Sequence, residues 1–172
     1  EREAARREQD WAAADTLPCT QSTVFLAKRH QLVVATSQGD RNWSFQEGRT
    51  FKVGQGVAGR VAQTGKPRLV TQAANDPAFS PGWSEPEADP ESLVVVPILL
   101  DGRVYGVISV EHNRTHAFDE QDQRLLETLA SQVSQAVRNA RLFETRQRLE
   151  TQLQSLHQVV QEQSLDRVLE RI

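Results

Sequence analysis

The spacing of glycines between residues 54 and 67 constrains the fold of this chain more than any other feature. Gly54 and Gly56 precede a stretch of small and apolar residues, Gly59 lies inside that stretch, and the sequence Gly-Lys-Pro follows at 65–67. Glycine allows positive φ in a tight turn and lets a helix approach a sheet closely, whereas proline ends a helix. The segment therefore predicts a tight turn and a helix of about two turns, over residues 57–63, lying close to a sheet.

Strands are predicted on both sides of this short helix. Six segments are rich in the β-branched and aromatic residues that are typical of strands, and they cover residues 23–27, 31–36, 49–53, 67–71, 93–100 and 104–111. The last two are expected to form one hairpin, because Asp101-Gly102 between two apolar runs is a strong signal for a tight hairpin turn.

One long helix is predicted after the hairpin. No glycine or proline occurs from Asp119 onward, so the helix is expected to run to about Gln163, with Ser164 as the N-cap of a further helix. Apolar residues at helical spacing form a first stripe that is expected to pack on the sheet, and it comprises Leu126, Leu129, Val133, Ala136, Ala140 and Phe143.

A second stripe on this helix is displaced by one residue in the seven-residue count. It comprises Leu149, Leu153, Leu156 and Val160. Because no other segment of the chain is available to cover it, this stripe predicts a parallel homodimer through a coiled coil. A helix that stays solvated is the alternative.

In their order along the chain, the glycine segment, the hairpin and the helix opened by Phe118-Asp119-Glu120 resemble a GAF domain, over about residues 22–144. The resemblance implies an α+β fold of the GAF/PAS type, with a six-stranded antiparallel sheet flanked by helices and a long C-terminal helix. It also implies a small-molecule sensor in a multi-domain signalling protein. The expected organisation is an N-terminal helix (1–14), the sensor domain (15–144), a coiled-coil signalling helix (145–163) and the start of a truncated following domain (164–172).

A ligand of unknown identity is expected between the sheet, the short helix and a loop over residues 75–91. This loop carries four prolines, and a connection of such length in a compact domain is usually functional or disordered. Apolar walls with a few polar groups suit a small-molecule site, and the predicted ligand-binding residues are Val57, Val61, Asn75, Asp76, Phe79, Trp83 and Ser92. The alternative is a domain that binds no ligand and serves as a dimerisation spacer.

Composition excludes several classes of function. The net charge of −3 gives no electrostatic basis for binding nucleic acid, and no apolar run reaches the roughly 18 residues that span a bilayer. We therefore expect neither a nucleic acid nor a membrane as partner, and a cytoplasmic location. Cys19 is the only cysteine, which excludes an internal disulfide and a zinc site built from cysteines; it is either a partly buried apolar side chain or a reactive thiol.

The remaining motifs predict no metal and no dinucleotide cofactor. The Gly-x-Gly-x-x-Gly string at 54–59 lacks the long helix and the following acidic residue of a dinucleotide site. His112 and His116 are four residues apart, but they fall at a strand end and in a loop rather than on a helix, where that spacing suits a metal. His157 lacks the adjacent acidic residue of a phosphoacceptor histidine.

The family resemblance leaves a few specialised functions to weigh. The residues Asn113-Arg114 and Phe118-Asp119-Glu120 resemble the signature of GAF domains that bind cyclic nucleotides, with Arg114 where that family has lysine. The same acidic residues also suit a helix N-terminus, whose dipole they complement. GAF proteins that bind a bilin or reduce free methionine sulfoxide rely on cysteines that this chain lacks, so no enzymatic activity is expected.

Overall fold

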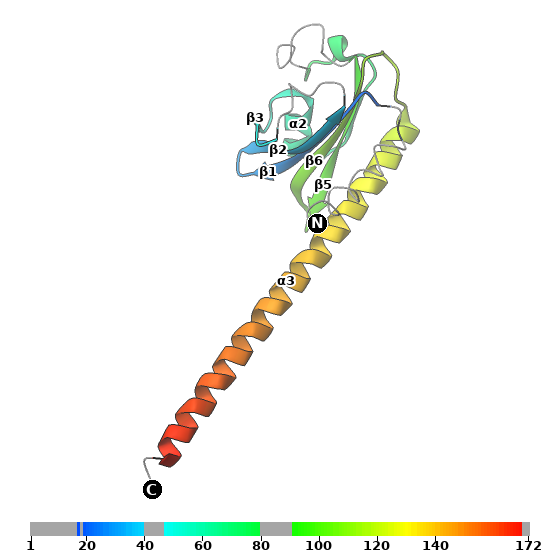
Figure 1. Cartoon of the computed structure of the whole chain (residues 1–172). Coiled ribbons are helices and arrows are strands. Elements are labelled where there is room, and N and C mark those ends of the chain that lie inside the picture. The colour runs from blue at the N-terminus through cyan, green and yellow to red at the C-terminus, as the bar shows by residue number, and fades with distance from the viewer. Residues whose placement is uncertain (1–16, 18, 40–46, 80–90, 170–172) are drawn as a thin grey trace. The chain divides into compact units, whose positions relative to one another are not determined.

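The computed structural model describes residue 17 and residues 19–39, 47–79 and 91–169, with side chains described up to residue 154. The predicted N-terminal helix (1–14) and Trp83 lie outside the described residues. The chain divides into two compact units, Glu1–Ser134 and Gln135–Ile172. Its elements follow in the order β1 (Gln21–Lys28), β2 (Gln31–Gly39), β3 (Thr50–Lys52), α2 (Gly56–Thr64), β4 (Arg68–Val70), the 3-10 helix η2 (Ala73–Asn75), β5 (Ser92–Leu100), β6 (Arg103–His112) and α3 (Glu120–Leu169) (Figure 1).

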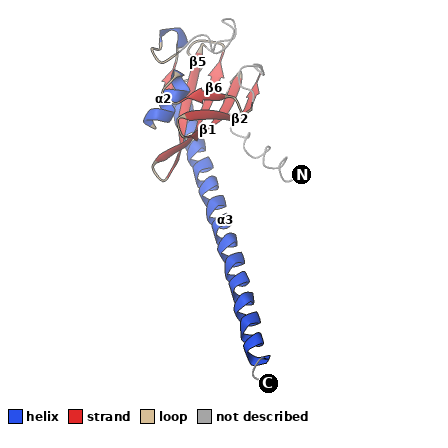
Figure 2. Cartoon of the chain, turned by 90° about the vertical axis from the view of Figure 1, so that its left-hand side faces the viewer, coloured by secondary structure: helices blue, strands red, loops and turns tan. Residues whose placement is uncertain are grey.

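The strands form one six-stranded sheet in the order β3-β2-β1-β6-β5-β4, and every pair of neighbours is antiparallel (Figure 2). The predicted α+β fold with a six-stranded antiparallel sheet is confirmed. The hairpin of β5 and β6 turns at Asp101 (φ 50°) and Gly102 (φ 75°), as the Asp-Gly pair predicts. Pairing of β1 with β6 joins the first hairpin of the sheet to the last.

Each face of the sheet has its own hydrophobic core. Core one contains Leu93 and Val95 of β5 together with Val57 and Val61 of α2. Core two contains Val94, Val96 and Ile98 of β5 together with Leu126 and Ala130 of α3. Successive side chains of a strand point to opposite faces, so the continuous apolar run of β5 follows from helices covering both faces (Figure 1).

Glycines set both ends of α2, as the sequence predicts. Gly56 has φ 69°, and Gly65 ends the helix in the left-handed conformation, with its N–H donating to the carbonyl of Val61 at 2.8 Å. A Cβ placed on Gly59 would lie 2.7 Å from the carbonyl oxygen of Lys52. A glycine inside the helix is therefore what allows α2 to pack against the turn that follows β3.

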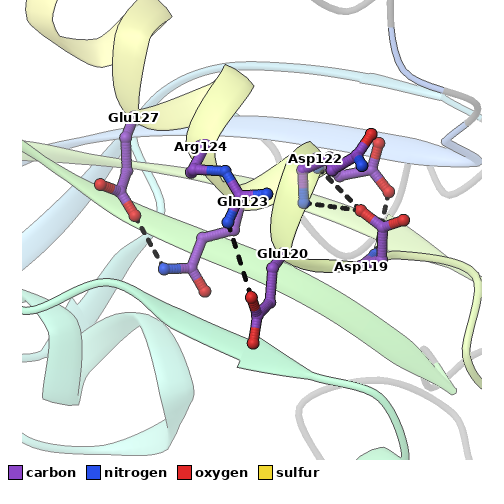
Figure 3. Close-up of polar contacts among 7 residues, drawn as sticks. Asp119, Glu120, Asp122, Gln123, Arg124 and Glu127 are labelled. Carbon is purple, nitrogen blue, oxygen red and sulfur yellow. Dashed lines mark hydrogen bonds and ion pairs between the residues drawn. The ribbon is translucent and has the colours of Figure 1, made fainter.

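The long helix α3 begins at a reciprocal cap (Figure 3). Asp119 Oδ1 accepts from the N–H groups of Gln121 at 2.7 Å and Asp122 at 3.1 Å, while the N–H of Asp119 donates to Asp122 Oδ2 at 3.0 Å. These bonds satisfy N–H groups that have no partner inside the helix. The acidic residues after Phe118 thus have a structural role that is independent of any ligand.

Two expectations for α3 are corrected. The helix continues through Ser164 to Leu169, so Ser164 does not start a separate helix. Of the first stripe, Leu126 is buried and Leu129 and Val133 are half-buried, whereas the stripe's last three residues, Ala136, Ala140 and Phe143, are exposed. In the part of the chain that the structure describes, no helix is long and apolar enough to cross a bilayer.

Candidate functional site

Helix α2 forms an apolar wall over one face of the sheet. Val57 and Val61 are 4% and 0% exposed and belong to core one. They share core one with Phe25 of β1 and Phe51 of β3, whose rings meet edge to face with centroids 5.7 Å apart. Val57 and Val61 therefore pack among neighbouring side chains of core one, and their role as ligand-binding residues stays a prediction.

Polar side chains gather on the same face of the sheet, at one end of its central strands. Gln21 and Thr23 of β1 pair with Glu111 and Ser109 of β6, and Thr23 also pairs with Ser37 of β2. Strand alternation places Gln21 and Thr23 on the face of Phe25, which belongs to core one. We call Gln21, Thr23, Ser37, Ser109 and Glu111 the polar patch.

Hydrogen bonds connect the members of the polar patch. Ser37 Oγ donates to the carbonyl of Ser22 at 3.3 Å and receives the Gln21 amide at 2.5 Å. It also lies 2.9 Å from Thr23 Oγ1, a hydrogen bond in which either hydroxyl can be the donor. Ser109 Oγ donates to Glu111 Oε1 at 3.1 Å.

Four of the five polar-patch residues are buried, and Ser37 is half-buried. Thr23 is 0% exposed, Gln21 and Ser109 are 1% exposed, and the carboxyl-bearing Glu111 is 5% exposed. Burying polar groups, and a carboxylate above all, costs free energy that hydrogen bonds or charges must offset. Small-molecule sites combine apolar walls with a few placed polar groups, and the polar patch shares its face of the sheet with α2. None of these five residues was predicted as a site residue from sequence.

The residues that begin the loop have structural contacts of their own. Asp76 Oδ2 accepts from the Arg68 guanidinium at 2.6 Å, and its Oδ1 accepts from the N–H of Ala78 at 2.7 Å. Asn75 is exposed and donates to Gln72 Oε1 at 2.7 Å. Phe79 is half-buried and packs on core one. The structure thus brings Phe79 to the same core as Val57 and Val61.

Ser92 lies on the other face of the sheet. It alternates with Leu93 of core one and shares its face with Val94 of core two. Its hydroxyl is buried and donates to the carbonyl of Arg114 at 2.7 Å. The structure therefore does not bring Ser92 together with Val57 and Val61, and Trp83 lies outside the described residues.

Other candidate residues take positions within the fold. His112 is 9% exposed, whereas His116 is exposed and has φ 52°. Among the described residues, no group of three or more histidine, cysteine, aspartate or glutamate side chains could hold a metal. Cys19 is half-buried and packs against core two, which fits the apolar role among the two considered.

Comparison with known proteins identifies the family. The profile of the family described as "GAF domain" matches residues 12–138, which is most of the chain. The chain belongs to the GAF domain family. The chain is also similar to the X-ray structure of the free methionine-R-sulfoxide reductase from Neisseria meningitidis, with a TM-score of 0.67 and 23% identity over 78% of this chain and 77% of that one. At that identity the likeness shows the fold alone.

Two curated relatives come from signalling and regulation. Hybrid signal transduction histidine kinase G of Dictyostelium discoideum is 30% identical over 105 residues, covering 60% of this chain and 3% of that protein. The Nif-specific regulatory protein of Azospirillum lipoferum is 32% identical over 94 residues, covering 51% of this chain and 15% of that protein. The chain thus matches only a small part of each relative's length.

Proposed function

We propose that this chain is a sensor domain that binds a small polar molecule on the α2 face of its sheet. The observation that carries the proposal is the polar patch, which lies on the same face of the sheet as the apolar wall of α2. Apolar area would supply binding free energy, and the hydroxyl, amide and carboxyl groups would select the ligand by its hydrogen-bonding pattern. The occurrence of related domains in a histidine kinase and in a Nif-specific regulator supports a role in signal transduction.

The second part of the proposal is that α3 passes the signal on through a parallel homodimer. Leu142, Leu149 and Leu153 are 65%, 55% and 65% exposed, and Leu156 and Val160 continue their spacing along α3. From Leu149 to Val160 the intervals are four, three and four residues, the pattern that lets two helices supercoil, and Leu142 lies seven residues before Leu149. The partner that fits it is a second copy of the same helix, which would connect to an output domain.

A ligand-free dimerisation spacer is the second candidate function. The packing of Val57 and Val61 favours it, because these side chains, 4% and 0% exposed, occupy the interface between α2 and the sheet. A buried polar cluster gives a pure spacer no advantage in stability, since well-packed apolar residues would serve it equally well or better. The polar patch therefore favours the sensor. Enzymatic activity is not part of the proposal, since Cys19 alone cannot complete a thiol-disulfide cycle within the chain.

A thermal-shift screen of metabolites tests the proposal. A ligand that binds only the folded protein raises its melting temperature with concentration. We expect at least one compound to stabilise the wild type, and the Glu111→Gln variant to respond much less. Glu127→Gln is the matched control, because Glu127 is half-buried on α3 and bonds to Gln123 at 2.7 Å, away from the polar patch.

Two outcomes would overturn the proposal. One is a screen in which no compound stabilises the wild type. The other is an equal response of Glu111→Gln and Glu127→Gln to the same compound, because the polar patch would then have no part in binding.

A further inference from the structure

Hydrogen bonds to both main-chain groups of Arg114, its N–H and its carbonyl, hold the connection between β6 and α3. The N–H of Arg114 donates to His112 Nδ1 at 3.1 Å, and the carbonyl of Arg114 accepts from Ser92 Oγ at 2.7 Å. Two residues further on, the N–H of His116 donates to the carbonyl of Thr71 at 2.8 Å. Ser92, His112 and the main chain of Arg114 together are called the clasp.

The clasp fixes the place where α3 begins. Ser92 and His112 are cross-strand partners at the ends of β5 and β6, and they are 0% and 9% exposed. The His112 ring meets the ring of Phe118 edge to face, with centroids 6.3 Å apart. Phe118 is buried in core two and directly precedes Asp119, the cap of α3. A shift of the end of β6 would therefore move the first turn of the helix.

The neighbours of the clasp residues face the opposite side of the sheet. Glu111 precedes His112 in β6 and belongs to the polar patch, and Leu93 follows Ser92 in β5 and belongs to core one. The main chain adds a second connection, since the N–H of Glu91 donates to the carbonyl of His112 at 3.0 Å and the N–H of Ala73 donates to the carbonyl of Glu91 at 2.8 Å. The clasp residues are thus the chain neighbours of residues on the α2 face, and they also hold the segment that leads to α3.

We propose that the clasp transmits a change at the polar patch to the first turns of α3. The inference rests on the proposed sensor function, and it assigns Ser92 and His112 as positioning residues rather than as ligand contacts. A ligand that displaces Glu111 would move the adjacent His112, and the two hydrogen bonds to Arg114 would carry that displacement to Phe118 and Asp119. Coupling of this kind requires two states that the ligand binds with different affinity.

Amide hydrogen exchange of the full chain tests the clasp without any ligand. Ser109→Ala serves as the perturbation, because it removes the hydrogen bond to Glu111 Oε1 within the polar patch. Ser92→Ala opens the clasp and is expected to speed exchange over residues 120–126 by about fivefold, the factor of one hydrogen bond of ordinary strength. Ser134→Ala is the matched control, since this buried serine donates within α3, to the carbonyl of Ala130 at 2.8 Å.

The decisive result is the comparison of Ser109→Ala in three backgrounds: the wild type, Ser92→Ala and Ser134→Ala. With an intact clasp, Ser109→Ala should speed exchange over the same residues by about twofold to fivefold, and in the Ser92→Ala background this increment should disappear. The Ser134→Ala background should retain it. An equal increment in all three backgrounds, or no increment with the clasp intact, would overturn the proposal.

A second variant guards against loss of folding. His112→Phe keeps a ring beside Phe118 and removes the Nδ1 acceptor, so it should abolish the increment as Ser92→Ala does; a full increment in His112→Phe would count against the clasp. Failure of the sensor function is separate. If the metabolite screen finds no ligand but the exchange coupling is observed, the sensor function is rejected and the coupling stands. If a ligand is found but the exchange coupling is absent, only the clasp is rejected.

Discussion

Replacing Gly59 with alanine should destabilise the domain, although alanine is the better helix former. The added Cβ would lie 2.7 Å from the carbonyl oxygen of Lys52 and 3.1 Å from the nitrogen of Gly54. Both are main-chain atoms, which cannot move aside as a flexible side chain would. Helix α2 must therefore shift away from the turn that follows β3, and the hydrogen bond from the Gly54 N–H to the Gly59 carbonyl, 2.8 Å long, would be strained.

Three contributions set the expected change in the free energy of unfolding, of which two are destabilising and one is stabilising. Overpacking costs about 1–3 kcal/mol, and loss of the Gly54–Gly59 hydrogen bond costs about 1 kcal/mol. The higher helix propensity of alanine returns about 1 kcal/mol. We therefore expect the free energy of unfolding of Gly59→Ala to fall by about 1–3 kcal/mol relative to the wild type.

Urea denaturation followed by circular dichroism measures this difference. With a slope of about 1–3 kcal/mol per molar urea, the midpoint should fall by roughly 1 M. The control is Arg60→Ala, the next residue of α2, whose exposed side chain should leave stability within about 0.5 kcal/mol. A Gly59→Ala variant as stable as the wild type, or more stable, would refute the close packing of α2 on this turn.

Three further predictions concern other parts of the chain. Gly56→Val should lower the free energy of unfolding by about 1–3 kcal/mol, because the φ of 69° is strained for a β-branched residue; an unchanged urea midpoint would contradict this. The double change Leu149→Glu and Leu153→Glu should give a monomer in sedimentation while the melting temperature of the sensor domain is retained, and a persisting dimer would exclude this seam. Asp76→Ala should cost about 1–3 kcal/mol by removing the buried partner of Arg68 and the acceptor for the Ala78 N–H; amide exchange at Ala78 that stays as slow as in the wild type would argue against that role.

The elements with a local signal were predicted correctly from sequence. Positive φ occurs where the sequence has residues that tolerate it, at Gly56, Gly65 and the Asp101-Gly102 pair. The six-stranded antiparallel sheet followed from the family resemblance and is confirmed, whereas its strand order was not predicted. The prediction of a new helix at Ser164 was wrong, because the preference of serine for an N-cap is weak compared with the cooperativity of a helix that continues.

The polar patch was missed because it depends on pairing between distant strands. Gln21 and Glu111 become neighbours only when β1 pairs with β6, and no local pattern reveals that register. Polar residues at alternate positions, such as Ser109 and Glu111 within an apolar strand, were the available signal. The face of Ser92 was beyond sequence reasoning for a related reason, since a strand position moved by one residue points to the opposite side of the sheet.

Native mass spectrometry of the freshly purified chain, before and after incubation with a cell extract of small molecules, tests whether the domain is a sensor. The wild type should form a dimer carrying an additional small mass, and Glu111→Gln, although folded and dimeric, should carry much less of it. A wild-type protein that shows only the mass of its polypeptide under both conditions would contradict the sensor function and favour the spacer.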